Sequence, residues 1–194
     1  MKRAPYQRSR QTRQKLLDAV IQLAREKTYE AITVQDICRR AGVSTGSFYH
    51  QFGSKDDLVM ATKDMVDALL TEELIDQIQP LPPLQALDRL LRRYILFIRD
   101  EIGPVLAQYY RVLLDHPDVP IQDAERAYCQ AVRGTLVRAA QAGLLTSGLS
   151  VDELAEMAMR LMRGLFMDWL LRAGDYDLMD RYETEFQLFL RYAC

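Results

Sequence analysis

Two short helix-forming stretches joined by a glycine-containing turn limit the fold of this chain more than any other feature of its sequence. The first begins at Thr33, which can cap the free N–H groups of a helix, and Asp36 completes a capping-box pattern three residues later. It ends at Gly42, which suits the left-handed conformation of a tight turn. The second starts at the cap residue Ser44 and ends at Gly53. This succession predicts a helix-turn-helix.

Helix signals continue through the rest of the chain, whereas strand-like alternation of Val, Ile and Thr is nearly absent. Besides the two short helices, we expect helices at about 9–27, 55–79, 84–100, 104–114, 120–142, 151–173 and 177–192. The prolines of QPLPPLQ at 79–85 mark a boundary because they interrupt any helix. We therefore expect an all-α protein of about nine helices. A three-helix N-terminal domain over residues 1–65 would precede a larger helical domain over residues 66–194.

The charge of the chain is distributed unevenly. Residues 1–63 hold 12 Lys and Arg against 6 Asp and Glu, whereas the remaining 131 residues hold 13 and 21. The first fifteen residues contain no acid and six basic side chains, those of Lys2, Arg3, Arg8, Arg10, Arg13 and Lys15. A basic arm on a nearly neutral protein favours attraction to a polyphosphate at one end.

The second short helix, TGSFYHQ, is unusually polar. Phe48 and Phe52, four residues apart, are expected to anchor its inner side. In a helix-turn-helix the other face enters the major groove of DNA, where hydroxyls and an imidazole hydrogen-bond base edges or phosphates. The residues expected on that face are Ser44, Thr45, Gly46, Ser47, Tyr49 and His50. A solvated linker between two helices is the alternative interpretation of this polar stretch.

The stretch TVQDICRRAGVSTGSFYHQFGSKDDL resembles the DNA-binding region of the tetracycline-repressor (TetR) family of transcriptional regulators. The family pattern combines a Thr-x-x-(Asp/Glu)-Ile helix, an Ala-Gly-Val-Ser turn, a Gly-x-(Phe/Leu)-Tyr helix and a Lys that opens the next helix. The matching positions are Thr33, Asp36, Ile37, Ala41 to Ser44, Gly46, Phe48, Tyr49 and Lys55. The match covers about residues 9–65, whereas the segments after Gln79 share only the family's general plan.

The resemblance implies a ligand-responsive regulator, most often a repressor, that binds a near-palindromic DNA operator as a homodimer and needs no cofactor or metal. By analogy, the residues expected at phosphates are Thr33, Tyr49 and Lys55, and those expected near bases are Ser44, Thr45 and Ser47. The family usually has His at the position of Gln51, whereas here the histidine is His50. Gln51 is still able to donate a hydrogen bond to a phosphate.

The helix expected from Val151 carries apolar side chains on more than one face, which indicates burial on more than one side. One side can pack on its own domain. The other, with Phe186, Phe189 and Leu190 of the last helix, can pair with a partner subunit in a four-helix bundle. We therefore expect a homodimer through the last two helices, and a single internal helix is the alternative.

The resemblance also implies a small-molecule effector pocket in the larger domain. The residues that could line it are Tyr94, Phe97, Tyr109, Tyr110, Met159, Met162, Arg163, Phe166 and Trp169. Each of the apolar and aromatic ones could equally fill the core. Arg163 could meet an acidic ligand or take part in a salt bridge.

Several classes of protein are not expected. The three cysteines lie far apart without a CxxC pair, which favours reduced thiols in a cytoplasmic protein, and Cys38 is expected to be a buried inert thiol rather than a redox sensor. No apolar run is long enough to span a membrane. Two distant histidines and the lack of a catalytic motif argue against an enzyme. The remaining alternative is a helical ligand-binding or adaptor protein of the same fold that does not bind specific DNA.

Overall fold

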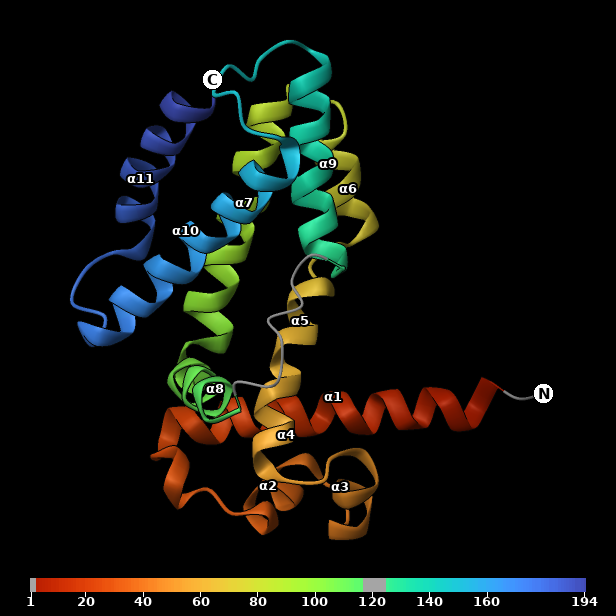
Figure 1. The fold of residues 1–194 in the computed structure, drawn as a ribbon. Coiled ribbons are helices and arrows are strands. Elements are labelled where there is room, and N and C mark those ends of the chain that lie inside the picture. Colours follow the sequence, from red (N-terminus) through yellow and green to blue (C-terminus); the bar gives the residue numbers. More distant parts are fainter. Residues whose placement is uncertain (1–2, 117–124) are drawn as a thin grey trace. The chain divides into compact units, whose positions relative to one another are not determined.

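A computed structural model describes residues 3–116 and 125–194, and within these ranges every regular element is a helix. Figure 1 shows their order along the chain. The all-α class is confirmed. The structure has eleven α-helices in its described part, and counting the interrupted run from α4 to α6 as one helix gives the expected nine. Residues expected to begin the helix at 120–142 lie partly outside the described ranges, and Lys2 of the basic arm lies outside them too.

The chain divides into two compact units. The first comprises Met1–Met65 and Asp100–Pro120, and the second comprises Val66–Arg99 and Ile121–Cys194. The segment with α8 (Gly103–Asp115), which was expected in the larger domain, therefore packs with the N-terminal helices. Its buried apolar residues Val105, Leu106 and Val112 explain this, since α8 contacts both α1 and α4.

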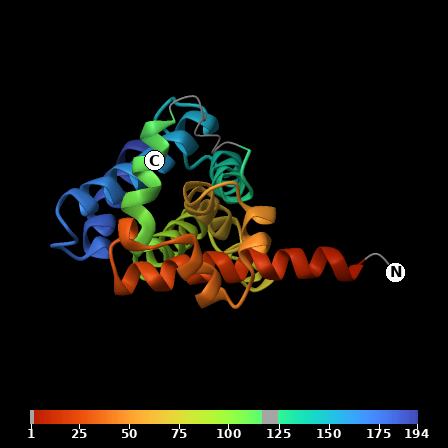
Figure 2. The same cartoon turned by 90° about the horizontal axis from the view of Figure 1, so that it is seen from below.

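The first unit is built around α1 (Arg3–Glu26), which contacts α2 (Val34–Ala41), α3 (Thr45–Gln51) and α4 (Lys55–Met60). Its helical stripe of apolar residues is buried as expected, at Leu16, Leu17, Val20, Ile21 and Leu23. The helix begins at Arg3, ahead of the expected start near Ser9. Figures 1 and 2 show its first turns extending beyond α2, α3 and α4, where they carry the basic arm away from the core of the unit.

The single long helix expected at 55–79 is wrong. The chain instead forms α4, a 3-10 turn (Ala61–Lys63), α5 (Asp64–Asp67) and α6 (Glu72–Ile78). The Thr71 hydroxyl accepts the Leu74 N–H at 3.2 Å and starts α6 afresh. Threonine competes for backbone hydrogen bonds in this way, so a run of helix formers is interrupted without proline or glycine.

The second unit contains α6, α7 (Pro83–Phe97), α9 (Ala127–Gln141), α10 (Val151–Leu171) and α11 (Leu178–Ala193). A π-helical turn at Ile98–Ile102 follows α7. Helix α7 contacts α9 and α11, and α10 contacts the same two helices, so the four form one apolar core. The capping box that opens α10 is present, with Ser150 and Glu153 bonded reciprocally.

Three of the four aromatic residues of α11 point into this unit. Tyr182, Phe186 and Phe189 stack in sequence with ring centroids 5.2 and 6.0 Å apart, and all three are buried. The expectation that Phe186 and Phe189 face a partner subunit is therefore wrong, because their own unit already buries them. No helix in the described part of the chain is both long and apolar enough to cross a lipid bilayer.

Candidate nucleic-acid interface

The start of α2 is held by the predicted capping box. Thr33 Oγ1 accepts the Asp36 N–H at 3.1 Å, and Asp36 Oδ2 accepts the Thr33 N–H at 3.1 Å. Lys27 Nζ lies 2.8 Å from the same carboxylate oxygen. The hydrogen bond from Lys27, followed by those from Thr33, holds the pKa of Asp36 well below its usual range. The backbone and the side chain of Thr33 are therefore both engaged with Asp36.

The turn between α2 and α3 also forms as predicted. Gly42 has φ of 67° in the left-handed region, where a side chain would be strained. The Val43 N–H donates to Cys38 O at 3.0 Å and closes the end of α2. Cys38 itself is buried, and burial raises the pKa of its thiol against the opposing effect of a hydrogen bond with Thr45. A raised pKa agrees with the inert thiol expected from the sequence.

Helix α3 gives one face to the core and the rest to the surface. Phe48 and Phe52 are buried with their rings 6.0 Å apart, which confirms them as the inner anchors. The Ser44 Oγ accepts the Ser47 N–H at 3.1 Å and caps the helix. The exposed predicted residues are Ser44, Thr45, Gly46, Tyr49 and His50, while Ser47 and Gln51 are half-buried. Tyr49 is 58% exposed, an unusual position for an aromatic side chain in a folded unit.

A groove of about 430 Å³ runs between α3 and α1. Its lining is polar or glycine throughout: Arg8, Ser9, Thr12, Ser44, Gly46, Ser47, His50 and Gln51. The Gln51 side-chain amide donates to the Ser9 hydroxyl at 2.9 Å across the groove. Ser9 and Thr12 were not among the expected site residues. Thr12 is three residues from Ser9 and four from Arg8, and this helical spacing is the signal that could have placed Thr12 beside each of them.

Gly46 has no structural need to be glycine. A Cβ built there would meet only Ser44 Oγ, at an ordinary 3.8 Å, and the residue has no positive φ. Glycine inside a helix is less favourable than alanine by up to about 1 kcal/mol. Neither backbone strain nor crowding within the unit therefore requires glycine at this position.

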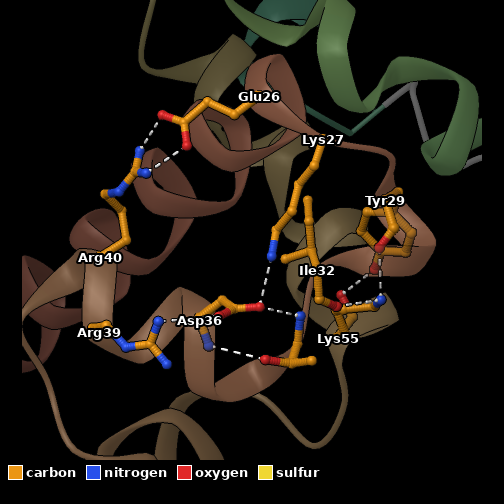
Figure 3. Close-up of polar contacts among 9 residues, drawn as sticks. Glu26, Lys27, Tyr29, Ile32, Asp36, Arg39, Arg40 and Lys55 are labelled. Atoms are coloured by element: carbon orange, nitrogen blue, oxygen red, sulfur yellow. Dashed lines mark hydrogen bonds and ion pairs between the residues drawn. The ribbon is translucent and has the colours of Figure 1, made fainter.

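Lys55 lies away from this exposed face. Its ammonium donates to the carbonyl oxygens of Tyr29 at 2.9 Å and Ile32 at 2.8 Å, and it sits 4.1 Å from the centre of the Tyr29 ring. Burial lowers the pKa of Lys55. Figure 3 shows the ammonium directed into this group, close to the Asp36 capping box at the start of α2. Among the predicted DNA-contacting residues, Lys55 is the one whose charged group is held by backbone carbonyls of its own unit.

The predicted effector-binding residues are divided between the two units. Tyr109 and Tyr110 lie on α8 in the first unit, and the other seven lie in the second. Within the second unit, Tyr94 contacts Phe166 and Tyr128, at centroid distances of 5.2 and 5.3 Å. Phe97, Met159, Met162 and Phe166 are buried, whereas Arg163 and Trp169 are half-buried. The apolar members thus take part in helix packing. Within the described ranges, no three His, Cys, Asp or Glu side chains converge as metal ligands do.

Comparison with known proteins supports this picture of the first unit. Residues 16–62 match the family model of bacterial regulatory proteins, tetR family. The HTH-type transcriptional regulator BetI of Escherichia coli (strain K12 / DH10B) is 35% identical over 78 residues, which are 40% of this chain and 40% of BetI. The matched region thus spans about two fifths of the length of these curated relatives.

Solved structures share the fold over nearly the whole chain. The regulator FadR from Bacillus subtilis, in complex with stearoyl-CoA, has a TM-score of 0.69 at 17% identity and covers 93% of this chain and 99% of its own. FadR from Thermus thermophilus, a repressor in complex with lauroyl-CoA, has a TM-score of 0.66 at 21% identity, covering 93% and 94%. At these identities the likeness concerns the fold. Residues 16–62 thus match the DNA-binding region of the tetR family of bacterial regulatory proteins, and the chain as a whole shares the fold of these solved regulators.

Proposed function

We propose that this protein is a ligand-responsive transcriptional repressor that binds a near-palindromic DNA operator as a homodimer. The observation that carries the proposal is α3, a short helix anchored by two buried phenylalanines that presents hydroxyls, an imidazole and a glycine to solvent. Packing of the unit does not require such a surface on α3. DNA offers the donors and acceptors that these side chains complement.

The outer face of α3 fits the major groove. Thr45 and Ser47 stand in the first turn, where helix-turn-helix proteins contact base edges. Tyr49 and Thr33, two exposed residues that carry hydroxyls, suit phosphates on either side. Arg8, in the groove beside α3, adds a cation next to them. The charge of the basic arm then supplies the sequence-independent part of the affinity.

Gly46 supports the same placement. Because nothing in its own unit occupies the space beside it, a close approach of DNA backbone or base explains why no side chain stands there. This feature points to DNA independently of the hydroxyls. It predicts that a methyl group at this position interferes with DNA and with nothing else.

A homodimer through α10 and α11 follows from the apolar side chains that these helices leave exposed. Leu171 is 79% exposed, Leu188 58% and Tyr192 53%. A groove between the two helices is lined by Met157, Leu161 and Gly164 beside charged side chains. A second copy that covers this face would bring two α3 helices to successive major grooves, roughly 34–36 Å apart.

We assign effector binding to the second unit. FadR proteins that share the fold of this chain were solved in complex with acyl-CoA molecules, which supports a small-molecule effector. An effector that prefers the conformer with the wrong α3 spacing lowers operator affinity by its differential binding free energy, typically about 1–3 kcal/mol. A regulator of this kind acts on chromosomal DNA, so we expect it in the cytoplasm. Catalysis forms no part of the proposal.

The test is binding to DNA from its own upstream region across a salt series. A specific regulator should bind a palindromic fragment about 10³-fold or more tightly than a scrambled one, with affinity that falls steeply as salt rises. Equal affinity for the two fragments would instead favour the alternative, a helical ligand-binding or adaptor protein.

Residue-level variants sharpen the test. Tyr49→Ala should weaken all operator variants alike, because a phosphate contact carries no sequence information. Thr45→Ala or Ser47→Ala should relax the preference at one base position. Indifference of both hydroxyl variants to operator sequence would show that α3 does not read bases.

A further inference from the structure

The ammonium group of Lys55 is held by two hydrogen bonds and an aromatic contact within the first unit. An ammonium group has three N–H donors. Two of them go to the Tyr29 and Ile32 carbonyl oxygens, and the Tyr29 ring lies 4.1 Å away on a third side. Figure 3 shows these contacts together. Two of the three donors of Lys55 are therefore committed within the first unit.

The side chain of Tyr29 in turn contacts the backbone of Lys55. Its hydroxyl lies 3.0 Å from Lys55 O and 3.2 Å from Asp56 Oδ1, both acceptors at the start of α4. The two residues therefore bind each other's backbone through their side chains, although they are 26 positions apart. This reciprocal pair joins the 3-10 turn Tyr29–Ala31 to α4.

The pair sits directly beside the proposed DNA contacts. Ile32, whose carbonyl accepts from Lys55, precedes Thr33, the cap of α2. Lys27 fixes the other side of the same cap through Asp36. The position of Thr33 relative to α4 is thus set by Lys55 on one side and by Lys27 on the other.

We propose that Lys55 is a positioning residue for DNA binding, which fixes Thr33 and the start of α2 and makes no phosphate contact of its own. The inference rests on the proposed function and deepens it. It differs from the role that the sequence resemblance implied for Lys55. The lowered pKa of the ammonium, caused first by burial, agrees with a cation withdrawn from solvent.

Salt dependence separates the two roles. A Lys or Arg that neutralises a phosphate releases counterions when DNA binds. Its loss makes the negative slope of log K against log salt shallower by about 0.9 per contact. Thr33 and the backbone N–H groups of α2 are neutral. Disturbing them weakens binding and leaves that slope unchanged.

The experiment measures operator and scrambled-fragment affinities of the full chain from about 50 to 200 mM KCl. Lys55→Met should weaken operator binding about tenfold with the wild-type slope, since it removes hydrogen bonds from a charged donor. Lys55→Arg should not restore affinity, because a planar guanidinium cannot replace a compact ammonium between two carbonyls. Arg8→Gln is the matched control. The negative slope of log K against log salt should become shallower by about 0.9 per subunit in this variant.

Tyr29→Phe provides a second variant that changes no charge. It removes the hydroxyl contacts to Lys55 O and Asp56 Oδ1, so binding should weaken by about fivefold at constant slope. Circular dichroism at the assay temperature measures the folded fraction of each variant. Affinities are corrected to that fraction, so a loss of fold alone cannot imitate a loss of positioning.

Three results would overturn the inference. A salt dependence that becomes shallower in Lys55→Met, as it does in Arg8→Gln, would make Lys55 a phosphate contact. Full affinity in Lys55→Arg would mean that charge alone suffices. An affinity loss explained entirely by the unfolded fraction would leave Lys55 a merely stabilising residue. If wild-type protein does not distinguish the two fragments, the proposed function fails first, and this inference fails with it.

Discussion

The side-chain amide of Gln51 donates to the hydroxyl of Ser9 at 2.9 Å, and this bond ties the last residue of α3 to α1 across 42 positions of sequence. The neighbouring His50 is exposed on α3, with its Nδ1 3.5 Å from the Gln51 amide. Gln51 thus links the C-terminal end of α3 to α1.

We expect Gln51→Ala and Ser9→Ala each to weaken operator binding by about 3- to 10-fold, the usual worth of one hydrogen bond. Because the two side chains form a single contact, the double variant should be little weaker than either single one. Fluorescence anisotropy with a labelled operator measures all three. Strictly additive losses would mean that each side chain acts on DNA separately.

Gly46→Ala should stabilise the protein and damage its function. Alanine is the better helix former by up to about 1 kcal/mol, and nothing in the unit obstructs the added methyl. Operator affinity should fall by about tenfold or more, since base contacts are worth about 1–3 kcal/mol. Urea unfolding and anisotropy report the two quantities.

The matched control for this glycine is Gly134→Ala on α9. Gly134 is also exposed within a helix, and no atom lies within 4 Å of the position that an added methyl group would take. The variant should gain similar stability and keep full operator affinity. Equal affinity of both variants would remove the case for close DNA approach at Gly46.

Asp67 should be important for the stability of the second unit. Its carboxylate accepts the Tyr128 N–H at 3.0 Å at the start of α9 and pairs with Arg126 at 3.2 Å. Asp67→Ala should lower the free energy of unfolding by about 1–3 kcal/mol, because it leaves a helix-start N–H without its acceptor and removes the ion pair with Arg126. Asp76→Ala, at an exposed carboxylate on α6, should change it by less than about 0.5 kcal/mol. Urea denaturation compares the two.

Acid should abolish the contribution of Asp36. Because its folded pKa is depressed, chiefly by Lys27, the carboxylate stabilises the fold fully above its unfolded pKa of about 4. The contribution declines as pH falls from there toward the lower folded pKa. The difference in urea midpoint between wild type and Asp36→Asn should stay constant from about pH 5 to 7 and shrink below about pH 4. A difference that persists unchanged as the pH falls well below about 4 would contradict this account.

Leu188→Arg should convert the homodimer into monomers, because it puts a charge on the apolar surface that α11 leaves exposed. Sedimentation velocity measures the assembly state, and operator affinity should fall with it. Leu114→Arg is the control, since Leu114 is an exposed leucine on α8, outside the proposed interface. A Leu188→Arg variant that remains dimeric would place the interface elsewhere.

Features that depend on neighbours within about four positions were readable from the sequence. The caps at Thr33, Ser44 and Ser150 each bond a backbone N–H three residues ahead, and Gly42 adopts the left-handed turn that its position demanded. Phe48 and Phe52 follow helical periodicity into the core. Local hydrogen bonds and periodicity need no knowledge of the rest of the chain.

Other features required the folded chain because their partners lie far away in sequence. The Tyr29 hydroxyl and Lys55 are 26 positions apart, Ser9 and Gln51 are 42, and Asp67 and Tyr128 are 61. The membership of α8 in the first unit and the inward stack of Phe186 belong to the same class. Composition and spacing identify which side chains could bond or be buried, whereas packing selects the partner, since many distant pairings satisfy the same local pattern.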